Sequence, residues 1–355
     1  MAMTFRTGSG SRFLAVAVAA AFAFAPLSDA RSDETETAQN TPVEDYADKR
    51  PGTFVLQVEN DLFGGGTDQY YTQGIQLTFV PKDEWEPVWF KELMGMVPGV
   101  DMDGESTYVV ALGQQMFTPE DTTVSDPDPT DRPYAGWLFA TVGAIVEKPE
   151  TNVLRNVSLD VGMVGPASLG GYTQRRWHSL IGVGLPRGWG KQLHNEPGIV
   201  LSYQARRRFE LIGAGNFLEL DVSPSVGAAV GNVLTQGTVG ASVRLGQNLD
   251  LTYGPPFIRP SLPAAAIVRK RNEFGWNLFA AIEGRAVGRN IFLDGNTFGD
   301  SRSVEKNNFV LDIQGGVEFT LGVTRISFTQ IYRTREFQGQ RVPSQFGSIS
   351  ISAIF

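Results

Sequence analysis

Two residues four positions apart, Gln174 and His178, are the side chains best suited to acid–base chemistry in this sequence. The chain has only two histidines, and imidazole is the side chain that most readily transfers protons near neutral pH. If the polar segment Gln174-Arg175-Arg176-Trp177-His178 is helical, its first and last residues share one face. His178 would then serve as a general base, while Gln174 would orient the imidazole or donate to an oxyanion. An ordinary histidine in a surface loop is the alternative interpretation.

A second polar group combines oxygen ligands with a hydroxyl. Asn60 and Asp61 carry the amide and carboxylate oxygens that Ca²⁺ accepts, so we expect both to take part in a calcium site. A bound cation would polarise an ester carbonyl and stabilise the oxyanion. Thr72 would orient the imidazole or donate to the oxyanion, or it would attack as the nucleophile with His178 as its base. Asn60 and Asp61 also suit an ordinary turn after a strand.

The first 50 residues predict export from the cytoplasm. Residues 1–30 combine Arg6 and Arg12 with an apolar, Ala-rich run and small residues at the expected cleavage site, which is typical of a signal peptide. Residues 31–50 are acidic and polar, and we expect a flexible periplasmic leader. Without residues 1–30 the chain keeps 28 of 30 basic and 37 of 38 acidic residues, a net charge of −9. That charge argues against a nucleic-acid partner.

The remaining residues, 51–355, predict an all-β fold, a transmembrane antiparallel β-barrel in the bacterial outer membrane. The chain has no cysteine, 40 glycines and 11% aromatic residues, and no later apolar run approaches the 18 residues of a membrane-spanning helix. Apolar and polar residues alternate instead, and the last strand ends on Phe355, as outer-membrane barrels typically do. We expect about twelve strands, at 53–60, 71–80, 106–117, 134–147, 153–164, 197–208, 215–228, 235–246, 275–288, 308–320 and 323–335 and at the carboxyl terminus.

This topology predicts where the polar residues lie. If both ends of the barrel chain are periplasmic, the connection after each odd-numbered strand faces outward. Asn60, Asp61 and Thr72 then flank the first outer loop, and Gln174 and His178 lie in the third, within a short helical insert at 165–196. All five would therefore meet at one rim, on neighbouring strands.

Two other groups of residues each have two possible roles, and a third group is excluded from the site. Arg175 and Arg176 beside His178 would meet the phosphate groups of an anionic lipid, or they are solvated loop charges. Residues 206–208, three consecutive arginines, should lie at the opposite end. The segment 81–105 holds Trp85, Trp89 and Phe90 and suits a short interfacial helix or a plug.

Four stretches resemble the outer-membrane lipid A deacylases that remove the 3′-acyloxyacyl chain of lipid A. The resemblance covers most of the chain after residue 30, in strand order, and is most specific in the first and third outer loops. The stretches are residues 58–61 (VEND), 71–74 (YTQG), 131–137 (DRPYAGW) and 164–170 (VGPASLG), the last continuing to Gln174, His178 and Ile181-Gly182.

The resemblance implies a twelve-stranded barrel with Ca²⁺-dependent esterase activity at its outer rim. It also implies lipid A within lipopolysaccharide as the substrate, with His178 as the base. Gln174, Thr72, Asn60 and Asp61 would then be its companions in the active site. We expect the protein to act as a monomer.

The sequence departs from that family at three positions. Gly184 and Pro186 stand where the family carries a glutamate and a tyrosine, and Val124 lies near the place of an expected lysine. These changes leave two alternatives open. One is an outer-membrane phospholipase that acts on another lipid ester, although no Asn-His-Ser group supports it. The other is a small barrel or channel without enzymatic activity.

Overall fold

The computed structural model describes residues 52–64, 69–82, 92, 105–213, 217–252 and 274–355. Residues 49–355 form one compact unit. The predicted signal peptide at 1–30 and leader at 31–50 lie outside the described residues, as does nearly all of the predicted interfacial segment at 81–105. No helix among the described residues is long and apolar enough to cross a membrane.

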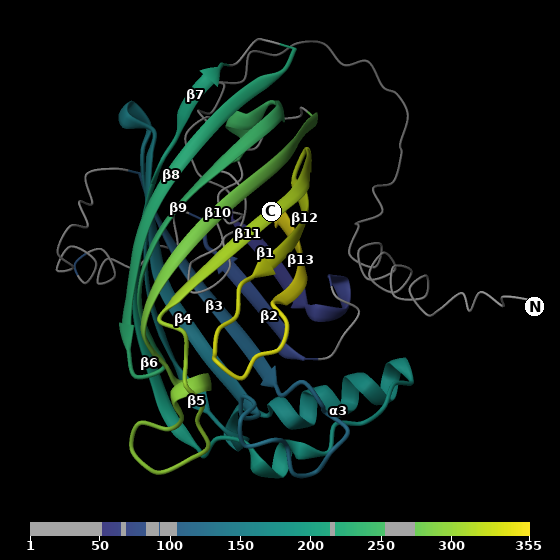
Figure 1. Ribbon diagram of the computed structural model, residues 1–355. Coiled ribbons are helices and arrows are strands. Elements are labelled where there is room, and N and C mark those ends of the chain that lie inside the picture. Colours follow the sequence, from purple (N-terminus) through teal and green to yellow (C-terminus); the bar gives the residue numbers. More distant parts are fainter. Residues whose placement is uncertain (1–51, 65–68, 83–91, 93–104, 214–216, 253–273) are drawn as a thin grey trace, which may run out of the picture. The chain divides into compact units, whose positions relative to one another are not determined.

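The compact unit is a closed antiparallel β-barrel (Figure 1). Its strands follow one another around the sheet in chain order, and the pairing of β1 with β13 and of β6 with β8 closes the ring. β7 continues the line of β6 along β8, so thirteen segments form twelve barrel strands. The strands are β1 (Thr53–Asn60), β2 (Tyr70–Val80), β3 (Glu105–Thr118), β4 (Ala135–Lys148), β5 (Val153–Val164), β6 (Glu196–Arg207), β7 (Phe209–Ile212), β8 (Glu219–Gly231), β9 (Leu234–Gln247), β10 (Phe274–Asn290), β11 (Phe309–Leu321), β12 (Thr324–Arg333) and β13 (Ser344–Ile354).

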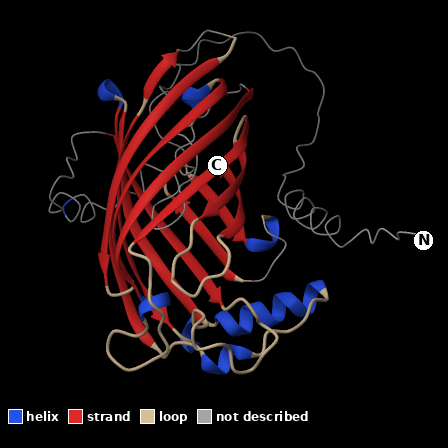
Figure 2. Cartoon of the chain, viewed as in Figure 1, coloured by secondary structure: helices blue, strands red, loops and turns tan. Residues whose placement is uncertain are grey.

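Among the residues that the structure describes, the helices of three or more residues lie in the connections between strands (Figure 2). Most of these are single turns of 3-10 helix, and the longest of them is the predicted helical insert between β5 and β6. The described helices of at least three residues are η1 (Asp61–Phe63), η3 (Pro149–Thr151), η4 (Pro166–Ser168), α3 (Gly170–Ile181), η5 (Gly188–Lys191), η6 (Leu249–Leu251) and α4 (Ile291–Asp294).

The predicted strands are confirmed, most of them within two residues at each end. One prediction needs correction. The strand expected at 215–228 runs from Glu219 to Gly231, because the preceding strand continues as β7. The strand expected at the carboxyl terminus is β13, which begins at Ser344.

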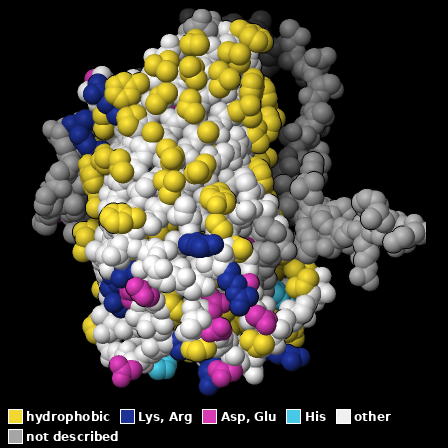
Figure 3. All heavy atoms as spheres, in the orientation of Figure 1, with side chains coloured by type: hydrophobic (Ala, Val, Ile, Leu, Met, Phe, Trp, Pro, Cys, Tyr) yellow, Lys and Arg dark blue, Asp and Glu magenta, His cyan; other side chains and the backbone are white. Residues whose placement is uncertain are grey.

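Alternating side chains give the wall an apolar outside. In β1, Phe54 and Leu56 are exposed, whereas Val55 between them and Gln57 and Glu59 after them are buried inside. Figure 3 shows apolar side chains spread over the strands and charged side chains gathered at the end where the long connections lie. This is the pattern of a barrel whose outer face meets lipid.

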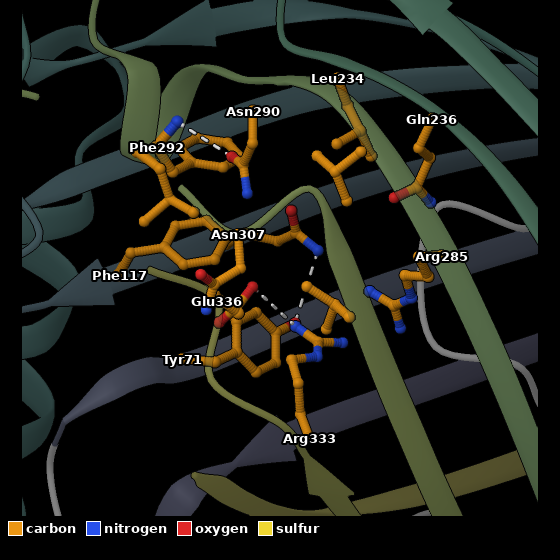
Figure 4. Close-up of a pocket in the computed structure, with 14 residues that line it drawn as sticks. Tyr71, Phe117, Leu234, Gln236, Arg285, Asn290, Phe292, Asn307, Arg333 and Glu336 are labelled. Carbon is orange, nitrogen blue, oxygen red and sulfur yellow. Dashed lines mark hydrogen bonds and ion pairs between the residues drawn. The ribbon is translucent and has the colours of Figure 1, made fainter. Parts of the chain in front are cut away.

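The interior is filled by side chains in the part of the chain that the structure describes. Val55, Val80 and Ile145 belong to an apolar cluster near one end, and an aromatic cluster around Phe117 lies toward the other. The interior also holds buried ion pairs, among them Arg244–Asp221, Arg285–Asp312 and Arg325–Glu318. A cavity of about 60 Å³ lies among Tyr71, Phe292, Arg285, Arg333 and Glu336 (Figure 4).

The connections after β1, β3 and β5 share one end of the barrel, because the strands alternate in direction. They comprise residues 61–69, 119–134 and 165–195, and helix α3 lies in the last of them. We call this the long-loop end. The predicted grouping of all candidate residues at one end is therefore confirmed. The predicted exclusion of residues 206–208 is confirmed too, since Arg206 and Arg207 pair with Leu154 and Val153 at the other end.

Candidate active site

Helix α3 buries one face and ends at Ile181, three residues after His178. Its buried residues are Gly170, Gly171, Gln174 and His178, which the helical repeat places on one side. The helix stops at Gly182, whose φ of +74° is a left-handed conformation that glycine adopts without strain. The amide groups of Gly182 and Val183 both donate to the carbonyl oxygen of His178. The shared face of Gln174 and His178 is thus as predicted.

The buried face of α3 covers the outside of the barrel wall. On β3, Gln115 and Phe117 point inward, where Gln115 donates to the hydroxyl of Tyr71, and Leu112 is exposed. Alternation then turns Gln114, Met116 and Thr118 outward. The site accordingly lies on the outer face of the wall and not in the lumen.

Close contacts seat this helix on β3 and β4. Gln114 donates from Nε2 to the carbonyl oxygen of Ser168, over 2.6 Å. A Cβ atom at Gly136, on the outward face of β4, would collide with Ser168 Oγ and lie 3.3 Å from the Cα of Gly170. Ser168 is fully buried, and its hydroxyl donates to the carbonyl oxygen of Gly165. Ser168 therefore acts as a structural residue here.

His178 is held by a backbone carbonyl. Its Nδ1 lies 2.6 Å from the carbonyl oxygen of Gly184. A carbonyl oxygen only accepts, so in the neutral ring Nδ1 carries the proton and Nε2 carries the lone pair. Nε2 is thereby assigned as the basic nitrogen. The main chain of Gly184 makes this contact, so it does not depend on a side chain at that position.

Gln174 is held by an indole. Trp189 Nε1 donates to Gln174 Oε1 over 2.6 Å, and both side chains are buried. Trp189 belongs to η5, in the segment that returns from α3 to β6, and packs with Met116 and Tyr134. No motif in the sequence marks Trp189 as a residue of the site. The one feature that could have drawn attention to it is its position between two glycines in a polar loop.

Thr72 faces outward, although strict alternation along β2 would turn it inward. Counting back from Thr78 and Gln76, which are buried inside, places Thr72 on the interior face. The pairing of β2 with β3 instead shifts between Tyr71 and Gln73, the mark of a β-bulge, just after Tyr70 with its φ of +67°. Thr72 Oγ1 consequently shares a 2.7 Å hydrogen bond with Oγ1 of outward-facing Thr118.

Asn60 and Asp61 form the turn after β1, and both are buried. Asn60 caps η1, since its Oδ1 accepts from the amide of Leu62 over 2.8 Å. Asp61 Oδ2 accepts from the amide of Gln69 over 2.6 Å. Both the turn and the supply of oxygen donors that the sequence suggested are therefore present.

The donor chemistry of this turn fits a hard cation. A buried carboxylate and a neighbouring amide oxygen are ligands that Ca²⁺ accepts, with backbone carbonyls and water completing its shell. Across the described residues, no three His, Cys, Asp or Glu side chains gather into a metal-binding group. Asp61 and Asn60 are thus the candidate side-chain ligands, and the cation would depend on oxygen donors from the backbone and solvent.

Charged residues around the site lie in two different environments. Arg175 and Arg176 are exposed on α3, and the guanidinium of Arg176 lies over the ring of Tyr172. Asp131, in the connection from β3 to β4, is half-buried, and that burial raises the pKa of its carboxyl. The carboxyl of exposed Asp128 instead has a lowered pKa, because the hydroxyl and amide of Thr130 donate to it. Asp128 is therefore solvated, whereas Asp131 in the same connection is partly shielded from water.

The register of the wall links the two groups of candidate residues. Asn60 on β1 is the partner of Gln73, the residue after Thr72. Thr72 is bonded to Thr118 on β3, and Met116, two residues earlier, packs with Trp189 beneath α3. The predicted residues thus occupy one continuous strip of the outer wall at the long-loop end, with α3 at one side and the Asn60–Asp61 turn at the other.

Comparison with known proteins adds a family and a fold. The model of a family described as outer membrane protein LpxR matches residues 14–355. A solved structure described as LpxR from Salmonella typhimurium is 19% identical, with 85% of this chain and 100% of that chain covered and a TM-score of 0.71. The β domain of the Bordetella autotransporter BrkA covers 86% of this chain and 99% of its own at 11% identity, with a TM-score of 0.40. No curated protein sequence matches the chain.

Proposed function

Because the chain belongs to the LpxR family of outer membrane proteins, the lipid A deacylases, we propose that it is an esterase with His178 as its general base. Family membership implies removal of the 3′-linked acyloxyacyl chain of lipid A. The observation that supports His178 most is the 2.6 Å bond from Nδ1 to the carbonyl oxygen of Gly184, which assigns the lone pair to Nε2. The long-loop end is then the outer-leaflet rim, where lipid A lies.

The reaction requires a nucleophile, a base and an oxyanion stabiliser. His178 Nε2 accepts a proton from water, and the hydroxide that forms attacks the ester carbonyl. The tetrahedral oxyanion collapses, the bond to the sugar oxygen breaks, and the imidazolium returns the proton to that oxygen. Thr72 is the alternative nucleophile; its hydroxyl would lose the proton to His178 and form an acyl-enzyme that water hydrolyses.

Three further groups complete the proposal. Gln174 supplies a hydrogen bond to the oxyanion. Asp61 and Asn60 would hold Ca²⁺, which supplies Lewis-acid stabilisation of the same charge when bound. Arg175 and Arg176 are exposed on α3 and would pair with phosphate groups of the lipid.

The test uses the purified barrel in detergent with lipid A or a diacyl phospholipid as substrate, and with Ca²⁺ or a chelator. We expect release of the acyloxyacyl chain from lipid A and no hydrolysis of the phospholipid. We expect that release only in the presence of Ca²⁺. His178→Ala should lower kcat/KM about 100-fold or more, as loss of a general base does. The matched control is His194→Ala, since His194 is the other histidine and is exposed.

Three results would contradict parts of the proposal. An unchanged rate in His178→Ala would remove the assigned base. Full activity with the chelator would remove the cation. Hydrolysis of the phospholipid but not of lipid A would point to the phospholipase alternative.

A further inference from the structure

Building on the proposed function, we propose that Trp189 is a positioning residue for Gln174. Its indole N–H fixes the direction of the Gln174 amide, so that Gln174 presents its NH₂ group, and not its carbonyl oxygen, to the ester. Trp189 would thus act through Gln174 without touching the substrate.

The chemistry of the two groups decides which way the amide points. An indole nitrogen is a donor only, whereas a glutamine amide has an accepting oxygen and a donating nitrogen. The 2.6 Å contact from Trp189 Nε1 must therefore end on Gln174 Oε1. The reversed amide would set two donors against each other in a buried site, which costs free energy. Nε2 of Gln174, which can only donate, then points away from the indole.

The surroundings of Trp189 hold the indole in place. It is 3% exposed, and its ring lies 5.0 Å from that of Tyr134. Gly170 and Gly171 make room for it, since a Cβ atom at either position would approach the indole to 2.9 Å. A donor fixed in this way directs the amide without reorganisation during the reaction, which is what an oxyanion site requires.

The helix places this donor beside the base. Gln174 and His178 are one turn apart on the buried face of α3, where residues at that spacing are neighbours. The segment after the helix holds both, through the carbonyl of Gly184 and the indole of Trp189. The sequence left two roles open for Gln174, orienting the imidazole or donating to the oxyanion. The Trp189 contact favours the second.

A second tryptophan–glutamine pair provides a matched control. Trp276 Nε1 donates to Gln247 Oε1 over 3.0 Å, at the end of the barrel opposite to α3. Trp276→Phe removes the same kind of hydrogen bond far from the site, and Trp189→Phe removes it within the site. Both changes keep an aromatic ring.

The experiment measures kcat and KM for lipid A with Ca²⁺ in the wild type, Trp189→Phe, Trp276→Phe, Gln174→Ala and the Trp189→Phe/Gln174→Ala double variant. Each variant is first checked for a folded barrel by its heat-modifiable migration on a gel. We expect kcat to fall about 10- to 100-fold in Trp189→Phe with KM within about twofold, because the Gln174 amide is no longer held with its NH₂ group toward the oxyanion. In the Gln174→Ala background the same change should have almost no further effect on kcat.

A second variant keeps the inference open to refutation if Trp189→Phe does not fold. Gln174→Glu preserves the shape and the bond from the indole, but it removes the NH₂ donor. We expect it to lose activity as fully as Gln174→Ala does. Near-wild-type kcat in Gln174→Glu, or in folded Trp189→Phe, would overturn the inference, as would an equal loss from Trp189→Phe in both backgrounds. A wild type that does not deacylate lipid A would instead refute the proposed function.

Discussion

At the residue scale, the state of one imidazole ring decides whether His178 can act as the base. The contact with Gly184 predicts that the neutral ring carries its proton on Nδ1. Nitrogen NMR of protein labelled with ¹⁵N-histidine should therefore show the Nδ1–H tautomer for one of only two rings. His194→Gln assigns the signals by removing the other. The opposite tautomer at His178 would leave Nε2 without its lone pair and would contradict the assignment.

The side-chain types of the site could be predicted from the sequence, but their neighbours could not. His178 and Gln174 stand out because histidine is rare here and the spacing suits one helical face. Strict alternation would place Thr72 on the wrong face, since a single bulge at the start of β2 inverts the alternation and leaves no clear mark in the sequence. Trp189 was missed because its contact with Gln174 depends on a loop that folds back over the helix.

At the element scale, the seat of α3 on the outer wall depends on the absence of a side chain at Gly136. Gly136→Val should displace the helix from β4, because the new side chain would collide with Ser168. We expect activity to fall about 100-fold, since small displacements of catalytic groups are costly, while the barrel still folds. Gly237→Val on β9 is the matched control, because nothing lies within 4 Å of that position.

Activity assays and gel migration of the two folded variants test this seat. If Gly136→Val retained full activity, the position of α3 on the wall would be unimportant for activity.

The spacing of polar residues in this insert predicted a helix. It could not predict which side of the wall the helix covers, because that depends on the contacts of Gln114 and Gly136 with residues more than 30 positions away.

At the scale of the whole molecule, buried charges tie the loops to the barrel interior. Arg132, in the predicted motif at 131–137, is fully buried, lies over the ring of Phe117 and pairs with Glu336 in the connection between β12 and β13. Burial lowers the pKa of Arg132, whereas Glu336 and Asp131 act against that shift. Glu336→Ala should destabilise the barrel by about 3–5 kcal/mol, the usual effect of stranding a buried charge.

Urea unfolding of the variant in detergent, beside Glu305→Ala at an exposed position, measures that loss. Equal stability of the two variants would show that the Arg132–Glu336 pair contributes nothing to stability.

The barrel itself could be predicted from alternation, because strand period and lipid contact are local properties. The filled interior could not, because it depends on which inward residues of distant strands face one another across the lumen.

We propose that this barrel deacylates lipid A from a site on its outer wall, with His178 as the base. The most direct test is mass spectrometry of lipid A from cells that express the wild type, His178→Ala or His194→Ala, at matched amounts of folded protein. The account predicts loss of one acyloxyacyl group with the wild type and with His194→Ala, and intact lipid A with His178→Ala. Intact lipid A in all three, or the same loss in all three, would contradict it.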